Sequence, residues 1–375
     1  MLVETFRYER GAWSRAFPAL DSAQTLVLAF ASPSYADRGD VFAELRRAFP
    51  QAAMIGCSTA GEIDHTQVRD ESIVVAAVRF ERTCVKEVVA RIDGAAGSFA
   101  AGGRLAEALV GPELRAVFVL SRGHDVNGSE LIRGLNATLP AGVVVTGGLA
   151  GDGPRFGQTF VIADGAPASD AIVAVGVYGE HVHVGHGSKG GWDAFGHERV
   201  VTKSKGNVLY ELDDRPALAL YKEYLGERAA GLPGSALLFP LSLRASQDST
   251  ESVVRTVLGV DEATQSMVFA GDIPEGAYAK LMRANFDRLI MGAQAAGHAA
   301  LRDHAGPALS IAISCVGRRL VLGERTEEET EAALEELPAG TVQVGFYSYG
   351  EISPHTTGRC DLHNQTMTLT VLGEA

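Results

Sequence analysis

Short apolar runs alternate along the chain with segments of helical periodicity. The first run, at 25–32, is followed by apolar residues at positions 41, 42, 45 and 49, and then by a second apolar run that starts at residue 52. Apolar runs of this length are typical of buried strands, and the spacing between them is typical of an amphipathic helix. The pattern predicts a strand–helix–strand unit, which leads into a glycine-rich loop ending at Gly61-Glu62.

The same unit recurs at 115–152 and at 307–352, and Leu-Pro-Ala-Gly precedes the second strand in both later copies. After each glycine loop the chain re-enters strands, at 72–80, 160–178 and 365–372. A strand–helix–strand crossover is parallel, and the strands after it add antiparallel pairs. The expected fold class is therefore α/β, with mixed parallel/antiparallel sheets built from repeated strand–helix–strand–glycine-loop units.

The helices of the later copies each begin with the spacing of a capping box. These are Asn127-x-x-Glu130 and Thr326-x-x-Glu329, in which each side chain would bind a backbone amide of the first turn. The acidic run that follows Thr326 is interpreted as a solvated helix face.

A different stretch separates the second and third units. Its pattern predicts short strands over 252–282, a long helix over 285–305, and a helix from about Pro216 to Leu225. We expect two domains with their junction in this region. The expected division is an N-terminal extension at 1–20, one domain at 21–215 and a second at 216–375.

The composition and net charge of the chain argue against several classes of binding partner. A chain of 375 residues suits two domains, and its net charge of −13 argues against binding to nucleic acid or to anionic membranes. The longest uncharged stretch, 134–151, carries five glycines and a proline, which is not the pattern of a membrane-spanning helix. The four cysteines are far apart, so we expect a reducing, cytoplasmic location without disulfides.

Several phrases of the sequence resemble the FIST family. In chain order they are GCSTAGEI, GNVLYELDDRPALALYKEYLG, VVRTVLGVD, FAGDIPEG, GFYSYGEISP and LHNQTMTLTVL. The resemblance covers the FIST-N and FIST-C domains. It implies an intracellular sensory protein that binds a small, amino-acid-like ligand and relays to a separate signalling protein such as a sensor kinase. Some stand-alone members of the family are haem-binding nitric-oxide sensors, so the resemblance implies haem as the alternative ligand.

The three glycine loops are the predicted ligand site, because loops at the carboxyl ends of parallel strands commonly bind ligands in open α/β sheets. Glu62, Asp152 and Glu351 close these loops and would suit an ammonium group, while nearby arginines would bind a carboxylate. Alternatively, each acid accepts backbone N–H bonds within its own turn. Residue type and spacing do not separate these two interpretations. The candidate ligand-binding residues are Gly56, Cys57, Ser58, Thr59, Gly61, Glu62, Gly147, Gly148, Gly151, Asp152, Arg255, Arg283, Arg318, Tyr347, Tyr349, Gly350 and Glu351.

No complete catalytic constellation is recognisable. The segment Gly56–Gly61 has one residue too many for a G-x-S-x-G nucleophile elbow, and a strand follows it instead of a helix. We therefore expect no enzyme activity from Cys57 or Ser58.

Histidines offer two further interpretations. His181, His183 and His186 have a spacing that suits either a metal site or the wet face of a half-exposed strand. If haem binds, the candidate axial ligands are His65, His124, His186 and His355, which lie in or near the glycine-loop regions.

Overall fold

The three predicted units are present in the computed structural model, which describes residues 1–249, 252–301, 306–354 and 359–375. In each unit two parallel strands are joined by helix. The first unit consists of β3 (Thr25–Ala31), α1 (Gly39–Ala48) and β4 (Ala53–Ser58), the second of β9 (Leu114–Ser121), α3 (Gly128–Thr138) and β10 (Val144–Leu149), and the third of β24 (Leu309–Cys315), α6 (Val316–Leu322), α7 (Thr326–Glu335) and β25 (Val342–Ser348).

The capping-box predictions have different outcomes. The side chain of Asn127 accepts a hydrogen bond from Glu130 N at 3.1 Å, as predicted. The prediction for Thr326 is wrong, because its hydroxyl donates to the carbonyls of Gly323 and Arg319 and caps no amide. Glu329, the other half of that motif, is buried.

After each glycine loop the chain forms a hairpin that joins the sheet of another unit. The hairpin after the first loop pairs with the third unit, the one after the second loop pairs with the first unit, and the one after the third loop pairs with the second. These hairpins are β5–β6 (Glu62–Asp64, Gln67–Arg69), β11–β12 (Val161–Ala163, Ala166–Ala168) and β26–β27 (Gly350–Pro354, Cys360–His363). The exchange is cyclic, so each sheet is completed by a segment distant in sequence.

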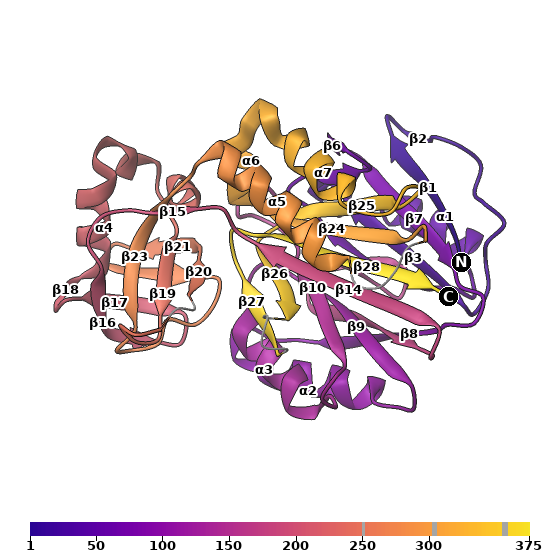
Figure 1. Cartoon of the computed structure of the whole chain (residues 1–375), viewed down its shortest axis with the longest axis horizontal. Helices are drawn as coiled ribbons and strands as arrows, with labels where there is room; N and C mark the ends of the chain where they lie inside the picture. Colours follow the sequence, from indigo (N-terminus) through magenta and orange to yellow (C-terminus); the bar gives the residue numbers. More distant parts are fainter. Residues whose placement is uncertain (250–251, 302–305, 355–358) are drawn as a thin grey trace.

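The remaining strands follow the same cycle. A return strand lies antiparallel to the first strand of each unit, and a further strand covers its outer edge. The return strands are β7 (Ile73–Arg79), β13 (Ala171–Tyr178) and β28 (Met367–Glu374), and the edge strands are β1 (Leu2–Glu9), β8 (Cys84–Arg91) and β14 (Val182–Lys189). β8 follows the first unit in the chain and covers the sheet of the second, and β14 follows the second unit and covers the sheet of the third. The sheet of the first unit is covered by β1, from the start of the chain. Met1 and Glu374 accordingly form an ion pair at 3.4 Å, near the two termini marked in Figure 1.

One glycine recurs at the same place in each unit. In the second strand of each parallel pair, a Cβ atom would lie within 2 Å of the carbonyl oxygen of the paired residue on the first strand. The pairs are Gly56 with Ala29 (1.9 Å), Gly147 with Val119 (1.8 Å) and Gly345 with Ala312 (1.8 Å). These glycines are required by the close approach of backbones within each unit.

Residues 190–285 leave the three units between β14 and α5 (Phe286–Ala300). They form a nine-stranded sheet with an apolar core of its own. We call this segment the inserted domain and the rest of the chain the repeat body. Its elements are β15 (Asp193–Ala194), β16 (Arg199–Lys205), β17 (Val208–Leu212), β18 (Arg215–Pro216), α4 (Ala217–Leu225), β19 (Leu241–Arg244), β20 (Val253–Arg255), β21 (Val257–Asp261), β22 (Ser266–Phe269) and β23 (Tyr278–Arg283). In Figure 1 it lies to the left of the repeat body. Strands β20 to β23 confirm the predicted strands at 252–282, and α4 and α5 confirm the two predicted helices; residues 302–305 of the helix predicted over 285–305 lie outside the described residues.

Strand pairing crosses the expected division at residue 215. The hairpin β26–β27 pairs with β10, and β14 pairs with β28, so residues on both sides of this position share sheets. The division into domains at 21–215 and 216–375 stays a prediction. In the described part of the chain, no helix has the length and apolar character needed to cross a membrane.

Candidate functional site: glycine loops and an interdomain cleft

The three glycine loops meet at the centre of the repeat body, where their backbones bind one another. Gly151 N donates to Ser58 O at 3.0 Å, Ala60 N donates to Tyr347 O at 2.8 Å, and Tyr349 N donates to Leu149 O at 3.2 Å. Each loop thus bonds to the other two. These backbone groups of the predicted ligand site thus bind one another.

Glu62 is buried within the first loop. Ser72 donates to its carboxylate from both N (3.1 Å) and Oγ (2.7 Å), and the Thr59 hydroxyl donates to its other oxygen. Burial raises the pKa of Glu62 to about 7, although these three donors oppose the shift. Within the same loop the Cys57 thiol is buried, which raises its pKa, and Ser58 Oγ accepts a hydrogen bond from Phe160 N at 3.1 Å.

Glu351 has the equivalent environment in the third loop. Thr366 donates to its carboxylate from N (3.1 Å) and Oγ1 (2.9 Å), and Ser348 Oγ donates at 2.6 Å. Burial raises the pKa of Glu351 to about 8. The two acids are therefore matched by position, by donors and by the direction of the pKa shift.

Asp152 differs because the second loop is one residue shorter. Its carboxylate accepts hydrogen bonds from Gly157 N (2.7 Å) and Gln158 N (2.8 Å), and from the hydroxyl of Tyr349. Asp152 thus accepts backbone N–H bonds from its own loop, whereas the backbone donors to Glu62 and Glu351 are Ser72 and Thr366, 10 and 15 residues away in the sequence. The role of all three acids in ligand binding stays a prediction.

The structure separates the three candidate arginines. Arg283 is exposed at the end of β23. Arg318 is completely buried and forms an ion pair with Glu329 at 2.7 Å; its guanidinium also donates to Gly190 O (2.9 Å) and Leu289 O (2.7 Å). Because Gly190 and Leu289 flank the two connections to the inserted domain, Arg318 holds both connections against the repeat body. Tyr347 supports this arrangement, since its hydroxyl donates to Glu329 at 2.7 Å.

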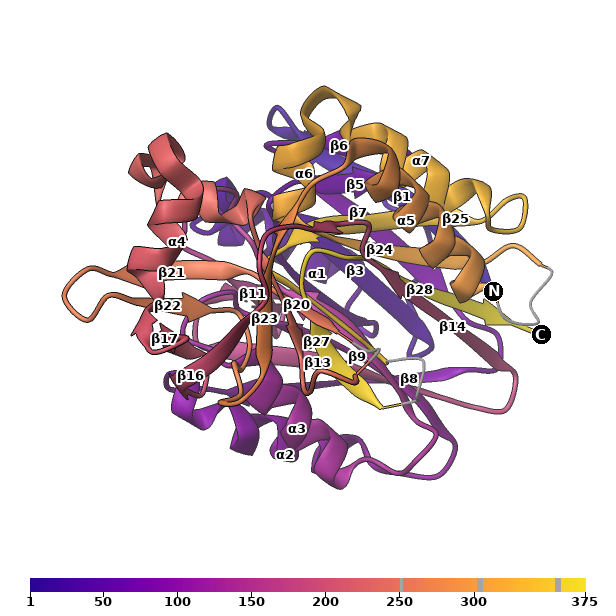
Figure 2. The ribbon, with the colours of Figure 1, turned by 60° about the vertical axis from the view of Figure 1, so that its left-hand side comes forward.

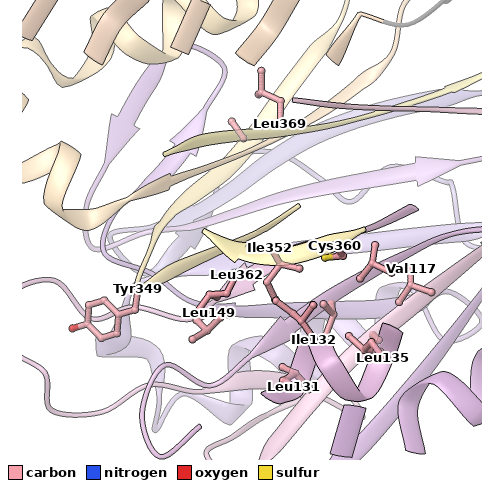
Figure 3. Packing of buried hydrophobic residues seen from close by; sticks show 14 of the residues in the cluster. Val117, Leu131, Ile132, Leu135, Leu149, Tyr349, Ile352, Cys360, Leu362 and Leu369 are labelled. Atoms are coloured by element: carbon pink, nitrogen blue, oxygen red, sulfur yellow. The ribbon is translucent and has the colours of Figure 1, made fainter. Parts of the chain in front are cut away.

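Arg255 lies instead beside a cleft of about 750 Å³ between the inserted domain and the repeat body. One wall is α3 with the start of β27, and the other is formed by β19, β20 and residues 272–277. Figure 2 shows β20 next to β27, with α3 below them. Figure 3 shows Leu131, Ile132 and Leu135 of α3 packed towards the hairpin β26–β27, which fixes the first wall.

The guanidinium of Arg255 has an unusual environment. The residue is 5% exposed, and it donates to the carbonyls of Leu362 (Nη1, 2.8 Å) and Asp272 (Nε, 3.2 Å). Among the described residues no carboxylate lies within 4.0 Å of it. Burial lowers the pKa of Arg255, while the charges of Asp361 and Asp272 oppose that shift.

Polar bonds behind the cleft attach the inserted domain to the repeat body. Gln365 Nε2 donates to Leu237 O at 3.0 Å and to Thr256 Oγ1 at 3.1 Å, and Asn127 Nδ2 donates to Asp272 Oδ1 at 2.8 Å. Apolar side chains cross the same interface, since Leu237 and Ala270 of the inserted domain pack into the core of the repeat body.

The candidate haem ligands do not share a pocket. His65 is exposed, His186 lies on the edge strand β14, and His355 lies outside the described residues. His124 packs against the rings of Tyr349 (5.4 Å) and Phe156 (6.4 Å), and burial lowers its pKa. The described residues that line the 750 Å³ cleft include no histidine, and haem binding stays a prediction.

The described residues contain no group of three or more His, Cys, Asp or Glu side chains placed to hold a metal ion. His183 and His186 lie on β14, as the strand interpretation of their spacing expects, whereas His181 lies in the turn before this strand.

The cleft was missed from the sequence, although its residues lie in recognisable phrases. VVRTVLGVD supplies Arg255 and FAGDIPEG supplies Asp272, and both residues line the cleft. LHNQTMTLTVL supplies Leu362, whose carbonyl binds Arg255, and Gln365, which binds the inserted domain. The first two phrases belong to the inserted domain, and β27 of the third lies beside β20. The available signal was that all three phrases carry the family resemblance but lie outside the strand–helix–strand units.

Comparison with known proteins agrees with these phrases. The model of the FIST N domain matches residues 25–215, and that of the FIST C domain matches residues 217–354. The chain belongs to the FIST family. FIST domains are associated with sensory signal transduction.

Relatives of this FIST protein include two mycobacterial proteins. The uncharacterized protein Mb0898c of Mycobacterium bovis is 25% identical over 368 residues, which cover 92% of this chain and 90% of the relative. The uncharacterized protein Rv0628c of Mycobacterium tuberculosis is 26% identical over 249 residues, which cover 64% of this chain and 63% of the relative. The first similarity thus spans both FIST domains.

Proposed function

We propose that this FIST protein is a sensory protein whose small-molecule ligand binds in the cleft between the repeat body and the inserted domain. The observation that carries the proposal is the cleft itself. Its volume of about 750 Å³ is within the range of small-molecule sites, and such sites occur preferentially at domain interfaces. The mixture of apolar and charged side chains along its walls also suits a small organic ligand.

Signalling follows from the position of the cleft. A ligand that contacts both walls binds more tightly when the inserted domain is closed against the repeat body, and it shifts the population towards that pose. Arg318 holds the connections near Gly190 and Leu289, so movement of the inserted domain would occur about this point. A separate signalling protein, such as a sensor kinase, would then recognise the closed pose.

A thermal-shift screen of amino acids and other small metabolites tests this function. A ligand at 100 times its Kd adds about 2.7 kcal/mol of stability, which raises Tm by several degrees. In the variant Ala245→Trp an indole would occupy the cleft wall after β19, so the shift should disappear.

The matched control is Ala263→Trp, an exposed position in the turn between β21 and β22 of the same domain, where the shift should persist. A ligand that stabilises Ala245→Trp as strongly as the wild type binds elsewhere and contradicts the proposal. A broad screen without any hit also contradicts it and favours a role in partner docking.

A further inference from the structure

The two buried arginines of the described residues differ in how their charge is compensated. Arg318 is 0% exposed and Arg255 is 5% exposed. Arg318 forms an ion pair with Glu329 at 2.7 Å, whereas the hydrogen bonds of Arg255 go to main-chain carbonyl oxygens. A buried charge without a counter-ion is costly, which makes the position of Arg255 informative.

The acids nearest to Arg255 are bound to other groups. Asp272 Oδ1 accepts from Asn127 Nδ2 at 2.8 Å, and Asp361 Oδ1 accepts from Leu362 N at 2.7 Å. Their charges favour the charged form of Arg255, yet neither forms an ion pair with it. Local acids therefore compensate the guanidinium only in part.

The other arginines of the cleft divide into two kinds. Arg133 pairs with Glu130 at 2.5 Å, and Arg244 pairs with Glu198 at 2.7 Å. Arg359, which directly precedes β27, is exposed and forms no ion pair with any described residue. Among the described residues, the cleft thus has one buried and one exposed guanidinium without an acidic partner, in a chain whose net charge is −13.

We propose that the cleft binds a small organic anion, a carboxylate or a phosphate ester, with Arg255 as its anchor. Guanidinium groups bind both kinds of anion through paired, charge-assisted hydrogen bonds. Arg359 supplies a second positive charge at the entrance, and the apolar side chains of Ile132, Leu243 and Val253 contact the remainder of the ligand. This inference rests on the function proposed above and names the chemical class of its ligand.

Binding of simple anions to the full chain tests the inference. The probes are succinate, citrate, inorganic phosphate and phenyl phosphate at millimolar concentrations, each compared with sodium chloride at equal ionic strength. Succinamide is the neutral control for succinate. We expect at least one anion to raise Tm and succinamide to have no effect; the arm that responds identifies a carboxylate or a phosphate as the recognised group.

Two substitutions locate the effect. Arg255→Gln should weaken the apparent affinity for the anion at least tenfold. Arg255→Lys keeps the positive charge and should retain part of the binding, and it is the test if the glutamine variant fails to fold. Arg215→Gln removes an exposed arginine of the same domain outside the cleft and should bind as the wild type does.

Three results would overturn the inference: no response to any anion, an equal response of Arg255→Gln, or a response to succinamide equal to that to succinate. A neutral metabolite whose effect is abolished by Ala245→Trp would overturn the anionic class while leaving the proposed function intact.

Discussion

The buried pair of Arg318 and Glu329 makes a stringent prediction about stability. Both side chains are completely buried, and Glu329 also accepts hydrogen bonds from Ser314 (2.9 Å) and Tyr347 (2.7 Å). Glu329→Gln would leave the guanidinium charged and without a counter-ion. Breaking one partner of such a pair costs about 3–5 kcal/mol. For a chain of 375 residues, that loss corresponds to a fall in Tm of roughly 4–6 °C.

Differential scanning calorimetry of matched variants measures this effect. Glu328→Gln is the control, because Glu328 is an exposed neighbour whose ion pair with Arg325 is solvated and adds little stability. The double variant Arg318→Met with Glu329→Leu removes both charges and should recover most of the lost stability. It also releases Gly190 O and Leu289 O, so amide exchange near both connections should accelerate.

A Glu329→Gln variant whose Tm lies within 2 °C of the Glu328→Gln control would show that Arg318 does not need Glu329 as its counter-ion. A double variant less stable than Glu329→Gln would also contradict the prediction.

Three further predictions follow from buried groups elsewhere. Burial raises the pKa of Glu351 from 4.5 to about 8, so between these pH values the folded state holds a proton that the unfolded state releases. The free energy of unfolding should therefore fall by up to about 1.4 kcal/mol per pH unit as pH rises from 4.5 to about 8. Urea titrations at several pH values should show a weaker pH dependence of stability for Glu351→Gln than for the wild type. The pKa of Glu374 is lowered to about 2, by the amides of Glu81, Arg82 and Thr83. Glu374→Gln should therefore cost about 1.5–3 kcal/mol above pH 4.5, and the difference from the wild type should vanish as pH falls towards 2; a constant difference would contradict the assignment. Gly345→Ala would place a Cβ atom 1.8 Å from Ala312 O, so Tm should drop by several degrees, whereas Gly103→Ala on the open side of α2 (Ser98–Leu109) should not lower Tm.

Local patterns were sufficient to predict the elements of this fold. Strand and helix periodicity indicated all three units, and the capping box at Asn127 marks the first turn of α3. The exchange of hairpins was not predictable, because a hairpin pattern specifies its own two strands but not the sheet that it joins. Pairing between units depends on tertiary contacts that periodicity does not encode.

The candidate site shows the same limit. The acidic run after Thr326 indicated a solvated helix face, and Glu329 within it is instead the buried counter-ion of Arg318. Arg255 was among the predicted ligand-binding residues, but the sequence associated it with the glycine loops, from which the cleft is separate. The sequence shows which side chains are charged. It does not show which of them are buried or paired, and burial and pairing decide whether a charged side chain stabilises the fold or binds a ligand.

The central claim is that the ligand binds between the repeat body and the inserted domain. Hydrogen–deuterium exchange of the full chain, with and without a ligand from the thermal-shift screen, tests it most directly. We predict slower exchange in α3, in β19–β20 and at residues 272–277, which form both walls of the cleft. Slower exchange confined to the glycine loops at 56–62, 147–152 and 345–351 would contradict the claim and favour the loops as the site.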